Sequence, residues 1–584
     1  MYLENINGPE DVKKLNDEQM TALAEEMRAA LLKRASIHGG HFGPNFGMVE
    51  ATIALHYVFD SPKDKIVYDV SHQTYPHKML TGRKDAYLYQ DKYNDVSGYS
   101  NPHESEHDFF TIGHTSTSIS LASGLAKARN LKGEDGNVIA VIGDGSLSGG
   151  EALEGLDYAV ELDGNFIIVV NDNDMSIAEN HGGMYKNLAE LRETGGTASN
   201  NLFKAFGLDY IYEENGNDIA SLISLFRKVK DTDHPIVVHI HTQKGKGYEI
   251  AEKDKEGWHW CMPFDRETGK PTISFGDGED YTSITAEYIM QKAKSDSEFL
   301  VITPAMPGSA GLNQEQRKEL GLQYVDVGIA EEQAVAMASG AAKNGAKPLV
   351  VTNTTFIQRA YDQISHDVCI NNSSVTILLN YNSFDSLTDV THLGIFGLAA
   401  YTNVPNLVVL APTSKDEYLA MLDWSVDQKE HPVMILIPGN QVTYREADKD
   451  FNRLNHFKVE EAGEKVAILA LGDFYQRGEQ LSAKIKAELG FTPTLINPRF
   501  ASGIDKELLE SLSERHQMVI TMEDGILSGG FGEKIASFYG SSDMKVKNYG
   551  LDKKFYDRYD PNELLKEVGM TPAQIIADIC NQLK

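Results

Sequence analysis

Apolar strands and amphipathic helices alternate along almost the whole chain. Short apolar runs, such as residues 138–142, 166–170 and 235–240, are followed by helix-length segments with apolar residues at i, i+3 and i+4. Continuous apolar runs of this length are typical of parallel strands that are buried on both faces. The pattern therefore predicts an α/β fold built from doubly wound, mostly parallel sheets.

The alternation falls into three consecutive blocks. We predict domains at residues 1–275, 276–445 and 446–584, since 584 residues are enough for three or four domains with separate cores. Residues 258–280 are rich in Gly, Pro and Asp, which indicates an irregular linker at the end of the first domain.

Two polar clusters stand directly after neighbouring apolar runs. Asp144 lies in a Gly-Asp-Gly turn after the run at 138–142, and Asn173 ends an Asn-Asp-Asn cluster after the run at 166–170. Such clusters are often simple turns, but open α/β sheets bind ligands at these strand ends. Carboxylate and amide oxygens suit Mg²⁺ that also holds a diphosphate, and glycines let the backbone approach the phosphates.

Histidines follow other predicted strands. His41, His72 and His114 all stand near expected strand-to-helix junctions, so we predict that they share one cleft at the rim of the first sheet. A basic, glycine-rich loop with Lys244 and Tyr248 either is a solvated loop or contributes charge and N–H groups to a diphosphate.

The amino-acid composition argues against several kinds of binding partner. A formal net charge of −31 argues against nucleic acid and against an anionic membrane surface. Cys261, Cys369 and Cys580 are too few and too scattered for a disulfide framework or a zinc site. The first residues carry no apolar signal segment, so we expect a cytoplasmic protein that acts on small molecules.

Several blocks carry a family resemblance. They are SIHGGHFG, YDVSHQTYPHKMLTG, ESEHDFFTIGHTSTSIS, VIGDGSLSGGEALEG, VVNDNDMSI, VGIAEEQAV and TFIQRAYDQ. In this order they resemble 1-deoxy-D-xylulose-5-phosphate synthase, within the transketolase superfamily. The resemblance implies three transketolase-like domains that bind the diphosphate, bind the pyrimidine and form the C-terminal domain, in that order.

The resemblance also implies roles for individual residues. Asp144, Asn173 and the carbonyl of Met175 would hold Mg²⁺. Glu331 would hydrogen-bond the aminopyrimidine of thiamine diphosphate, and Phe356 would stack on that ring; a carboxylic group there favours the imino tautomer needed for proton removal. The cofactor would further be lined by His72, Gly113, His114, Thr115, Gly145, Ser146, Asn173 and Tyr248.

The implied reaction releases CO₂ from pyruvate and joins the remaining two-carbon unit to an aldehyde such as glyceraldehyde 3-phosphate. His41, His72 and His392 would transfer protons or orient the adduct, and Arg359 would bind the acceptor's phosphate. The family further implies a homodimer and a role in isoprenoid and thiamine biosynthesis.

The acceptor half departs from the family. Tyr381 and Leu436 stand where the family has arginines, Gly439 ends a segment without arginine, and Asn353 replaces an aromatic residue. Each lost charge-assisted contact costs roughly 1.5–3 kcal/mol. The segment from Met175 to Phe206 is also shorter than in the family, which would open the site.

Three alternatives follow. In the first, the enzyme would use a different, unphosphorylated aldehyde, unless other residues replace the lost arginines. In the second, it would transfer a ketol unit as transketolase does, without releasing CO₂. A non-enzymatic homologue is disfavoured because Glu331, Asp144 and Asn173 are all present.

Overall fold

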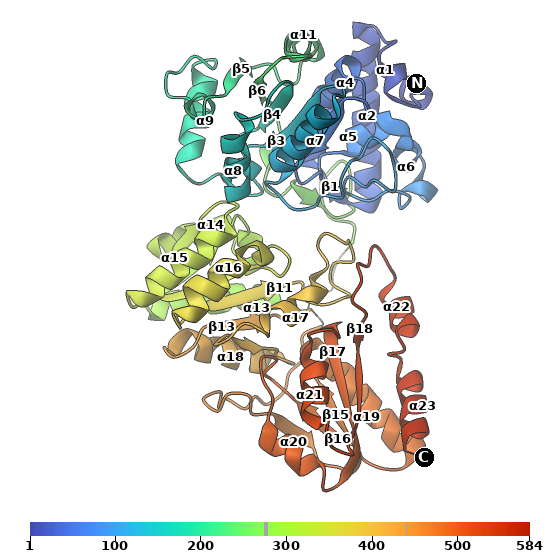
Figure 1. Cartoon of the computed structure of the whole chain (residues 1–584), viewed down its shortest axis with the longest axis vertical. Helices are drawn as coiled ribbons and strands as arrows, with labels where there is room; N and C mark the ends of the chain where they lie inside the picture. The colour runs from blue at the N-terminus through green and yellow to red at the C-terminus, as the bar shows by residue number, and fades with distance from the viewer. Residues whose placement is uncertain (274–277, 440, 584) are drawn as a thin grey trace. The chain divides into compact units, whose positions relative to one another are not determined.

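The computed structural model describes residues 1–273, 278–439 and 441–583. The predicted domain boundary at residue 275 lies outside these residues. The chain forms two compact units, Met1–Asp277 with Gly328–Ala330, and Gly278–Val327 with Glu331–Lys584, whose elements are labelled in Figure 1. Within the described ranges, no helix has the length and apolar character needed to cross a membrane.

The first unit is built on a five-stranded parallel sheet with the strand order β2-β3-β4-β6-β5. Its strands are β2 (Lys65–Tyr68), β3 (Val138–Gly143), β4 (Phe166–Asp172), β5 (Asp209–Glu213) and β6 (Pro235–His241). Every residue of β4 is buried, which explains the continuous apolar run at residues 166–170.

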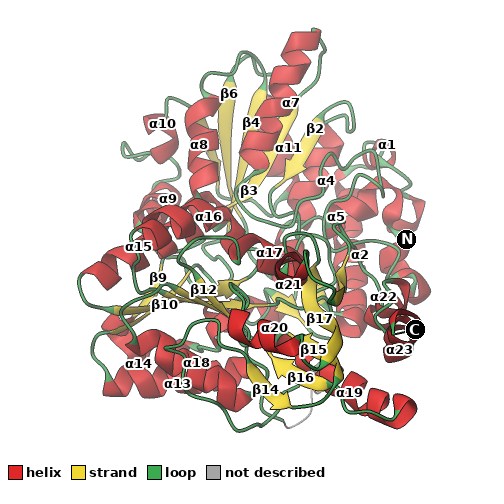
Figure 2. Cartoon of the chain, turned by 60° about the horizontal axis from the view of Figure 1, so that its bottom comes forward, coloured by secondary structure: helices red, strands yellow, loops and turns green. Residues whose placement is uncertain are grey.

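Helices cover both faces of this sheet (Figure 2). Alternate strand residues pack against α2 (Asp17–His38), α4 (Val49–Val58) and α11 (Ile219–Val229) on one face. The other face packs against α7 (Ser118–Lys132), α8 (Gly150–Ala159) and α9 (Gly183–Glu193). Shorter helices connect these elements: α1 (Pro9–Val12), α3 (Gly43–Gly47), α5 (Tyr75–Lys78), α6 (Asp85–Leu88), α10 (Leu202–Ala205) and α12 (Glu249–Lys253).

A separate two-stranded antiparallel ladder joins distant parts of the first unit. It pairs β1 (Gly40–His41) with β7 (Trp260–Cys261). The irregular linker predicted at 258–280 is therefore wrong at Trp260 and Cys261, because these two residues form a strand that pairs with Gly40 and His41. Short-range patterning does not reveal a pairing between segments more than 200 residues apart.

The second unit contains a six-stranded parallel sheet in the order β12-β13-β11-β10-β8-β9. The strands are β8 (Phe299–Thr303), β9 (Tyr324–Asp326), β10 (Lys347–Asn353), β11 (Thr376–Asn380), β12 (Val408–Leu410) and β13 (Val433–Leu436). One face packs on α13 (Tyr281–Ser295) and α18 (Lys415–Asp427), the other on α15 (Glu331–Lys343). Shorter helices are α14 (Gln314–Leu320), α16 (Tyr361–Gln363) and α17 (Gly397–Tyr401).

A further sheet of the second unit has the order β14-β16-β15-β17-β18, parallel except for β14 with β16. Its strands are β14 (Lys458–Glu461), β15 (Lys465–Ala470), β16 (Thr494–Asn497), β17 (His516–Ile526) and β18 (Lys545–Leu551). One face packs on α19 (Tyr475–Leu489) and α23 (Pro572–Gln582), the other on α20 (Lys506–Leu512) and α21 (Phe531–Tyr539); α22 is Pro561–Glu567.

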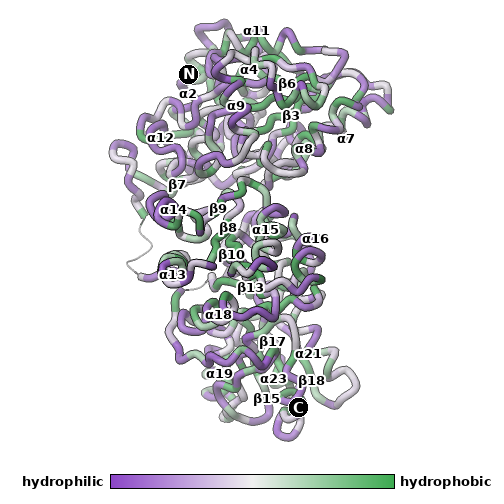
Figure 3. The backbone as a smooth tube through the Cα atoms, turned by 90° about the vertical axis from the view of Figure 1, so that its left-hand side faces the viewer, coloured by the Kyte–Doolittle hydropathy of each residue, from purple (hydrophilic) through white to green (hydrophobic). Residues whose placement is uncertain are grey.

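Hydropathy follows the same layers. In Figure 3 the central strands are hydrophobic, whereas the helices alternate between hydrophobic and hydrophilic positions. The doubly wound, mostly parallel α/β fold predicted from the sequence is confirmed.

Candidate active site

The polar residues predicted at the strand ends line one cavity of the first unit. Asp144 follows β3 and Asn173 follows β4, two strands that pair in parallel. The cavity has a volume of about 100 Å³. Its lining includes Pro44, Asp69, Val70, His72, Gln73, Thr115, Asp144, Gly145, Ser146, Asn173, Met175, Ser176, Lys244, His259 and Ile329.

The Asp144 and Asn173 side chains present oxygens suited to a hard cation. Asp144 is 2% exposed, and its Oδ2 accepts from Met175 N at 3.1 Å and from Asn180 Nδ2 at 2.8 Å. Burial and the nearby Asp172 raise the pKa of Asp144 to about 7. The buried Oδ1 of Asn173 has no hydrogen-bond partner among the described residues. The side-chain oxygens of Asp144 and Asn173 are suitable ligands for Mg²⁺, whose charge would stabilise the ionised form of Asp144.

Gly145 packs closely against Ser176 beside the cavity. A Cβ on Gly145 would lie 2.9 Å from Ser176 Oγ, so a larger side chain would clash there. Asp69 is fully buried after β2, and it accepts from the N–H groups of Ser116 at 2.8 Å and Ser118 at 3.0 Å. This ties the loop of Thr115 to the sheet. Close backbone approach and ordered loops are what a diphosphate requires.

Imidazole rings gather beside this cavity. The His41 ring lies 5.0 Å from the His72 ring and 5.9 Å from the His259 ring, and the His72 and His259 rings are 5.2 Å apart. Asn45 fixes two of these loops, because its Nδ2 donates to the carbonyls of His41 at 2.9 Å and His72 at 2.8 Å. His41 and His72 therefore lie close together, as predicted.

The prediction that all three histidines follow strands of the parallel sheet is partly wrong. His41 lies in the antiparallel β1–β7 ladder and not at the end of a strand of the parallel sheet. His114 lies in the loop before α7, and the lining residues include its neighbour Thr115 instead. Of the three, His72 is the one that comes shortly after a strand of the main sheet, β2.

Sequence reasoning missed His259 and left Lys244 undecided. Burial and the neighbouring Lys244 hold the pKa of His259 well below its usual range, so this imidazole is neutral near pH 7. Burial lowers the pKa of Lys244 to about 8, and its Nζ donates to Ser176 O at 2.6 Å. The one sequence signal for His259 was its aromatic setting between two tryptophans.

The backbone just before His72 is strained. Val70 has a φ of +56° and Ser71 a φ of +66°, a region that is costly for residues other than glycine and most of all for a β-branched one. The Ser71 hydroxyl donates to Ile112 O at 2.7 Å and accepts from Ser100 N at 2.8 Å. These two bonds hold the conformation that sends His72 toward the cavity.

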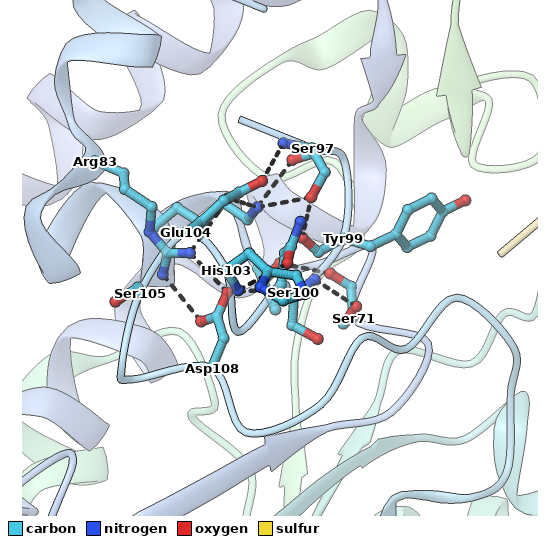
Figure 4. A network of polar contacts seen from close by, with 12 residues as sticks. Ser71, Arg83, Ser97, Tyr99, Ser100, His103, Glu104, Ser105 and Asp108 are labelled. Carbon is cyan, nitrogen blue, oxygen red and sulfur yellow. Dashed lines mark hydrogen bonds and ion pairs between the residues drawn. The ribbon is translucent and has the colours of Figure 1, made fainter. Parts of the chain in front are cut away.

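A buried ionic network supports the Ser100 loop. Asp108 accepts from Asn101 N at 2.7 Å and from Arg83 Nη1 at 2.6 Å, and its other oxygen lies 2.9 Å from His77 Nε2. Figure 4 shows Arg83 and Asp108 on one side of this network and Ser71 beside Ser100 on the other. The network thus links a buried ion pair to the backbone before His72.

The remaining predicted cofactor residues lie elsewhere. Tyr248 packs in an aromatic cluster with Phe42, Trp258 and Phe264, and its hydroxyl donates to Arg266 O at 3.1 Å. Neither Tyr248 nor Gly113 is among the described residues that line the cavity.

In the second unit, Glu331 begins α15 and is 3% exposed. Burial raises the pKa of Glu331 to about 7, against the attraction of Arg359. Arg359 Nη1 lies 3.6 Å from Glu331 Oε2. Phe356 and His392 form an edge-to-face pair with ring centroids 5.4 Å apart, and His392 Nδ1 lies 2.8 Å from Thr391 Oγ1. The structure therefore pairs Glu331 with Arg359, and Phe356 with His392.

The departures from the family also lie in this unit. Tyr381 follows β11 with a φ of +56° and is 43% exposed. Asn353 ends β10, where its Oδ1 accepts from Ser309 Oγ at 2.9 Å. Gly439 N donates to Asp473 Oδ2 at 2.9 Å. The Asp473 carboxyl thus contacts the segment in which the resemblance leads us to expect an arginine.

Comparison with known families defines the class of protein. Residues 278–443 match the transketolase pyrimidine-binding domain, and residues 455–575 match the transketolase C-terminal domain. The chain is therefore a transketolase-type enzyme. Among solved structures, transketolase from Campylobacter jejuni is 16% identical over 97% of this chain with a TM-score of 0.44, which is a weak likeness.

A match of the N-terminal part and two full-length relatives identify the family within this class of enzymes. Residues 3–199 and 193–242 match the family described as 1-deoxy-D-xylulose-5-phosphate synthase. Proteins with that name from Shouchella clausii and Geobacter sulfurreducens are each 36% identical, over 100% and 98% of this chain and 99% and 96% of their own lengths. The chain belongs to the 1-deoxy-D-xylulose-5-phosphate synthase family. It is a thiamine-diphosphate-dependent transferase.

Proposed function

We propose that this enzyme releases CO₂ from pyruvate and joins the remaining two-carbon unit to an aldehyde, as the name of its relatives implies. When bound, thiamine diphosphate supplies the carbanion and the electron sink for this chemistry. The observation that carries the proposal is the cavity at the ends of β3 and β4. There the buried Asp144 accompanies an amide oxygen of Asn173 that no described residue hydrogen-bonds.

We assign the metal to this cavity. Asp144 Oδ, Asn173 Oδ1 and the carbonyl of Met175 would hold Mg²⁺, which in turn would hold the diphosphate. Gly145 and Ser146 would lie against the phosphates, since both line the cavity and Gly145 leaves no room for a side chain.

The protein's own groups supply proton transfer. Glu331 would keep a proton at its buried carboxyl beside the aminopyrimidine, and its pKa of about 7 suits a group that gives and takes a proton near neutral pH. His41 and His72 would orient the substrate carboxylate and return a proton to the product. His259 would contribute a neutral imidazole to the same group.

Charged side chains near Arg359 and Gly439 bear on which acceptor the enzyme uses. Arg359 has a buried carboxylate as an ion-pair partner, so a substrate phosphate would compete with Glu331 for it. Tyr381 and Leu436 bring no positive charge, and Asp473 contacts Gly439. These features favour an unphosphorylated aldehyde over glyceraldehyde 3-phosphate.

We further propose a homodimer in the cytoplasm and the three-domain division at 1–275, 276–445 and 446–584. The separate sheets support that division.

Measuring CO₂ release from pyruvate with Mg²⁺ and thiamine diphosphate tests the reaction. Strong stimulation by glyceraldehyde 3-phosphate supports the synthase with its usual acceptor. Turnover without that stimulation, but with stimulation by an unphosphorylated aldehyde such as glyceraldehyde, supports the altered acceptor. Cofactor binding without CO₂ release overturns the pyruvate proposal and favours ketol transfer.

A further inference from the structure

The segment after Met175 is an ordered part of the cavity wall. It continues into α9, which Leu188 and Leu191 anchor in the core at 0% exposure. From this segment Asn180 Nδ2 donates to Asp144 Oδ2 at 2.8 Å, and Tyr185 Oη donates to Gly145 O at 3.3 Å. The segment therefore packs onto the Gly-Asp-Gly turn.

Arg192, near the end of α9, contacts two carboxylates. Its Nη1 lies 2.5 Å from Asp172 Oδ2, and its Nη2 lies 2.8 Å from Asp174 Oδ1. The guanidinium thus bridges the two carboxylates that flank Asn173. The Arg192 side chain is 14% exposed and that of Asp172 is fully buried, so at least the Asp172 contact is shielded from solvent.

The turn that carries Asn173 needs such support. Asp174 has a φ of +59°, a strained conformation for a residue other than glycine. Asp172 accepts from Asp174 N at 3.0 Å and lies 2.9 Å from His239 Nε2. In this turn Asn173 Oδ1 is a buried side-chain oxygen without a hydrogen-bond partner among the described residues.

We propose that Arg192 is a positioning residue that holds Asn173 in the conformation that receives Mg²⁺ with the diphosphate. The inference rests on the cofactor assignment of the proposed function. Arg192 is not among the described residues that line the cavity. It acts through Asp172 and Asp174. Helix α9, in the short segment after Met175, carries the arginine to this position.

An electrostatic role and a positioning role of Arg192 predict opposite changes in Mg²⁺ affinity when the arginine is replaced. Asp172, Asp174 and Arg192 together carry a formal charge of −1, and without the arginine they carry −2. A purely electrostatic role would therefore give tighter Mg²⁺ binding when Arg192 is replaced. A positioning role gives weaker binding, because the Asn173 turn loses its clamp.

The test measures the Mg²⁺ dissociation constant of the full-length protein at a fixed, saturating concentration of thiamine diphosphate, by calorimetry well below the unfolding temperature. We expect Arg192→Met to weaken binding by 10- to 100-fold, the range typical of residues that orient a metal ligand. Arg192→Lys should be intermediate, since one ammonium replaces the two-pronged fork. Unchanged or tighter binding in Arg192→Met overturns the inference.

Matched variants separate positioning from general stability. Arg227 is an exposed arginine on α11 that lies over Tyr57, and Arg227→Met should leave Mg²⁺ binding unchanged. Asp174→Asn removes the charge from one arm of the clamp and keeps an oxygen that can accept from Arg192. The risk to folding is small, because the Asp174 side chain is 63% exposed, and the variant should weaken binding by a smaller factor than Arg192→Met. An Asp174→Asn protein that binds Mg²⁺ as the wild type does overturns the charged contact between Arg192 and Asp174. Wild-type protein that fails to bind Mg²⁺ and thiamine diphosphate overturns the proposed function itself.

Discussion

Replacing the buried Glu331 by glutamine should change how stability depends on pH. The pKa of Glu331 is raised from 4.5 to about 7 by burial. Between these values the folded state binds a proton that the unfolded state has lost, so the contribution of Glu331 to stability falls as pH rises. The difference of 7 − 4.5, or about 2.5 pH units, corresponds to about 3 kcal/mol.

Glutamine keeps the shape of the side chain and cannot ionise. Below pH 4.5 the Glu331→Gln protein and the wild type should therefore differ by a constant amount. From pH 4.5 to 7 the variant should gain relative to the wild type, up to about 3 kcal/mol, and above pH 7 the difference should level off. Thermal unfolding midpoints of both cofactor-free proteins, measured side by side from pH 4.5 to 8.5, follow this difference.

Arg359 provides the second half of the test. Its guanidinium lies 3.6 Å from the carboxylate, and such a neighbour lowers a carboxyl pKa by about 1–3 units. Arg359→Met should therefore shift the pH-dependent loss of stability that Glu331 causes to higher pH. The double variant with Glu331→Gln and Arg359→Met should not show this pH-dependent loss. A difference between Glu331→Gln and wild type that stays constant from pH 4.5 to 8.5 refutes the raised pKa.

Three further predictions follow from single contacts. Ser71→Ala should cost about 1–3 kcal/mol, because Ser100 N–H and Ile112 C=O lose their partner; Ser71→Gly should lower the thermal midpoint less, since glycine tolerates a positive φ, and equal midpoints would contradict the strain. Asp108→Asn should cost about 3–5 kcal/mol, because it weakens the pairing of the buried Arg83; a midpoint within 1 °C of wild type would count against the network. Tyr381→Arg should lower KM for glyceraldehyde 3-phosphate about tenfold or more without changing KM for pyruvate; an unchanged phosphate-sugar KM would argue against this position as the acceptor site.

Much of the fold was predictable because its signals are local. Buried parallel strands have continuous apolar sequences, and helices show a 3.6-residue period, so the alternation of elements follows from neighbouring residues. The positions of Asp144 and Asn173 were also predictable, since parallel strands end at one edge of their sheet. The assignment to a family followed from motifs in their order.

Other parts of the site depend on pairings that no local pattern encodes. The β1–β7 ladder, which brings His259 to His41, joins segments far apart in the chain.

The sequence by itself determined the class of fold, the strand-end oxygens and the family, since each rests on short-range periodicity or on a contiguous motif. The tertiary structure alone decided which charges meet: Arg359 with Glu331, and Arg192 with the carboxylates beside Asn173. Such contacts depend on side chains that packing brings together and desolvates, and burial then sets their pKa values and their strength.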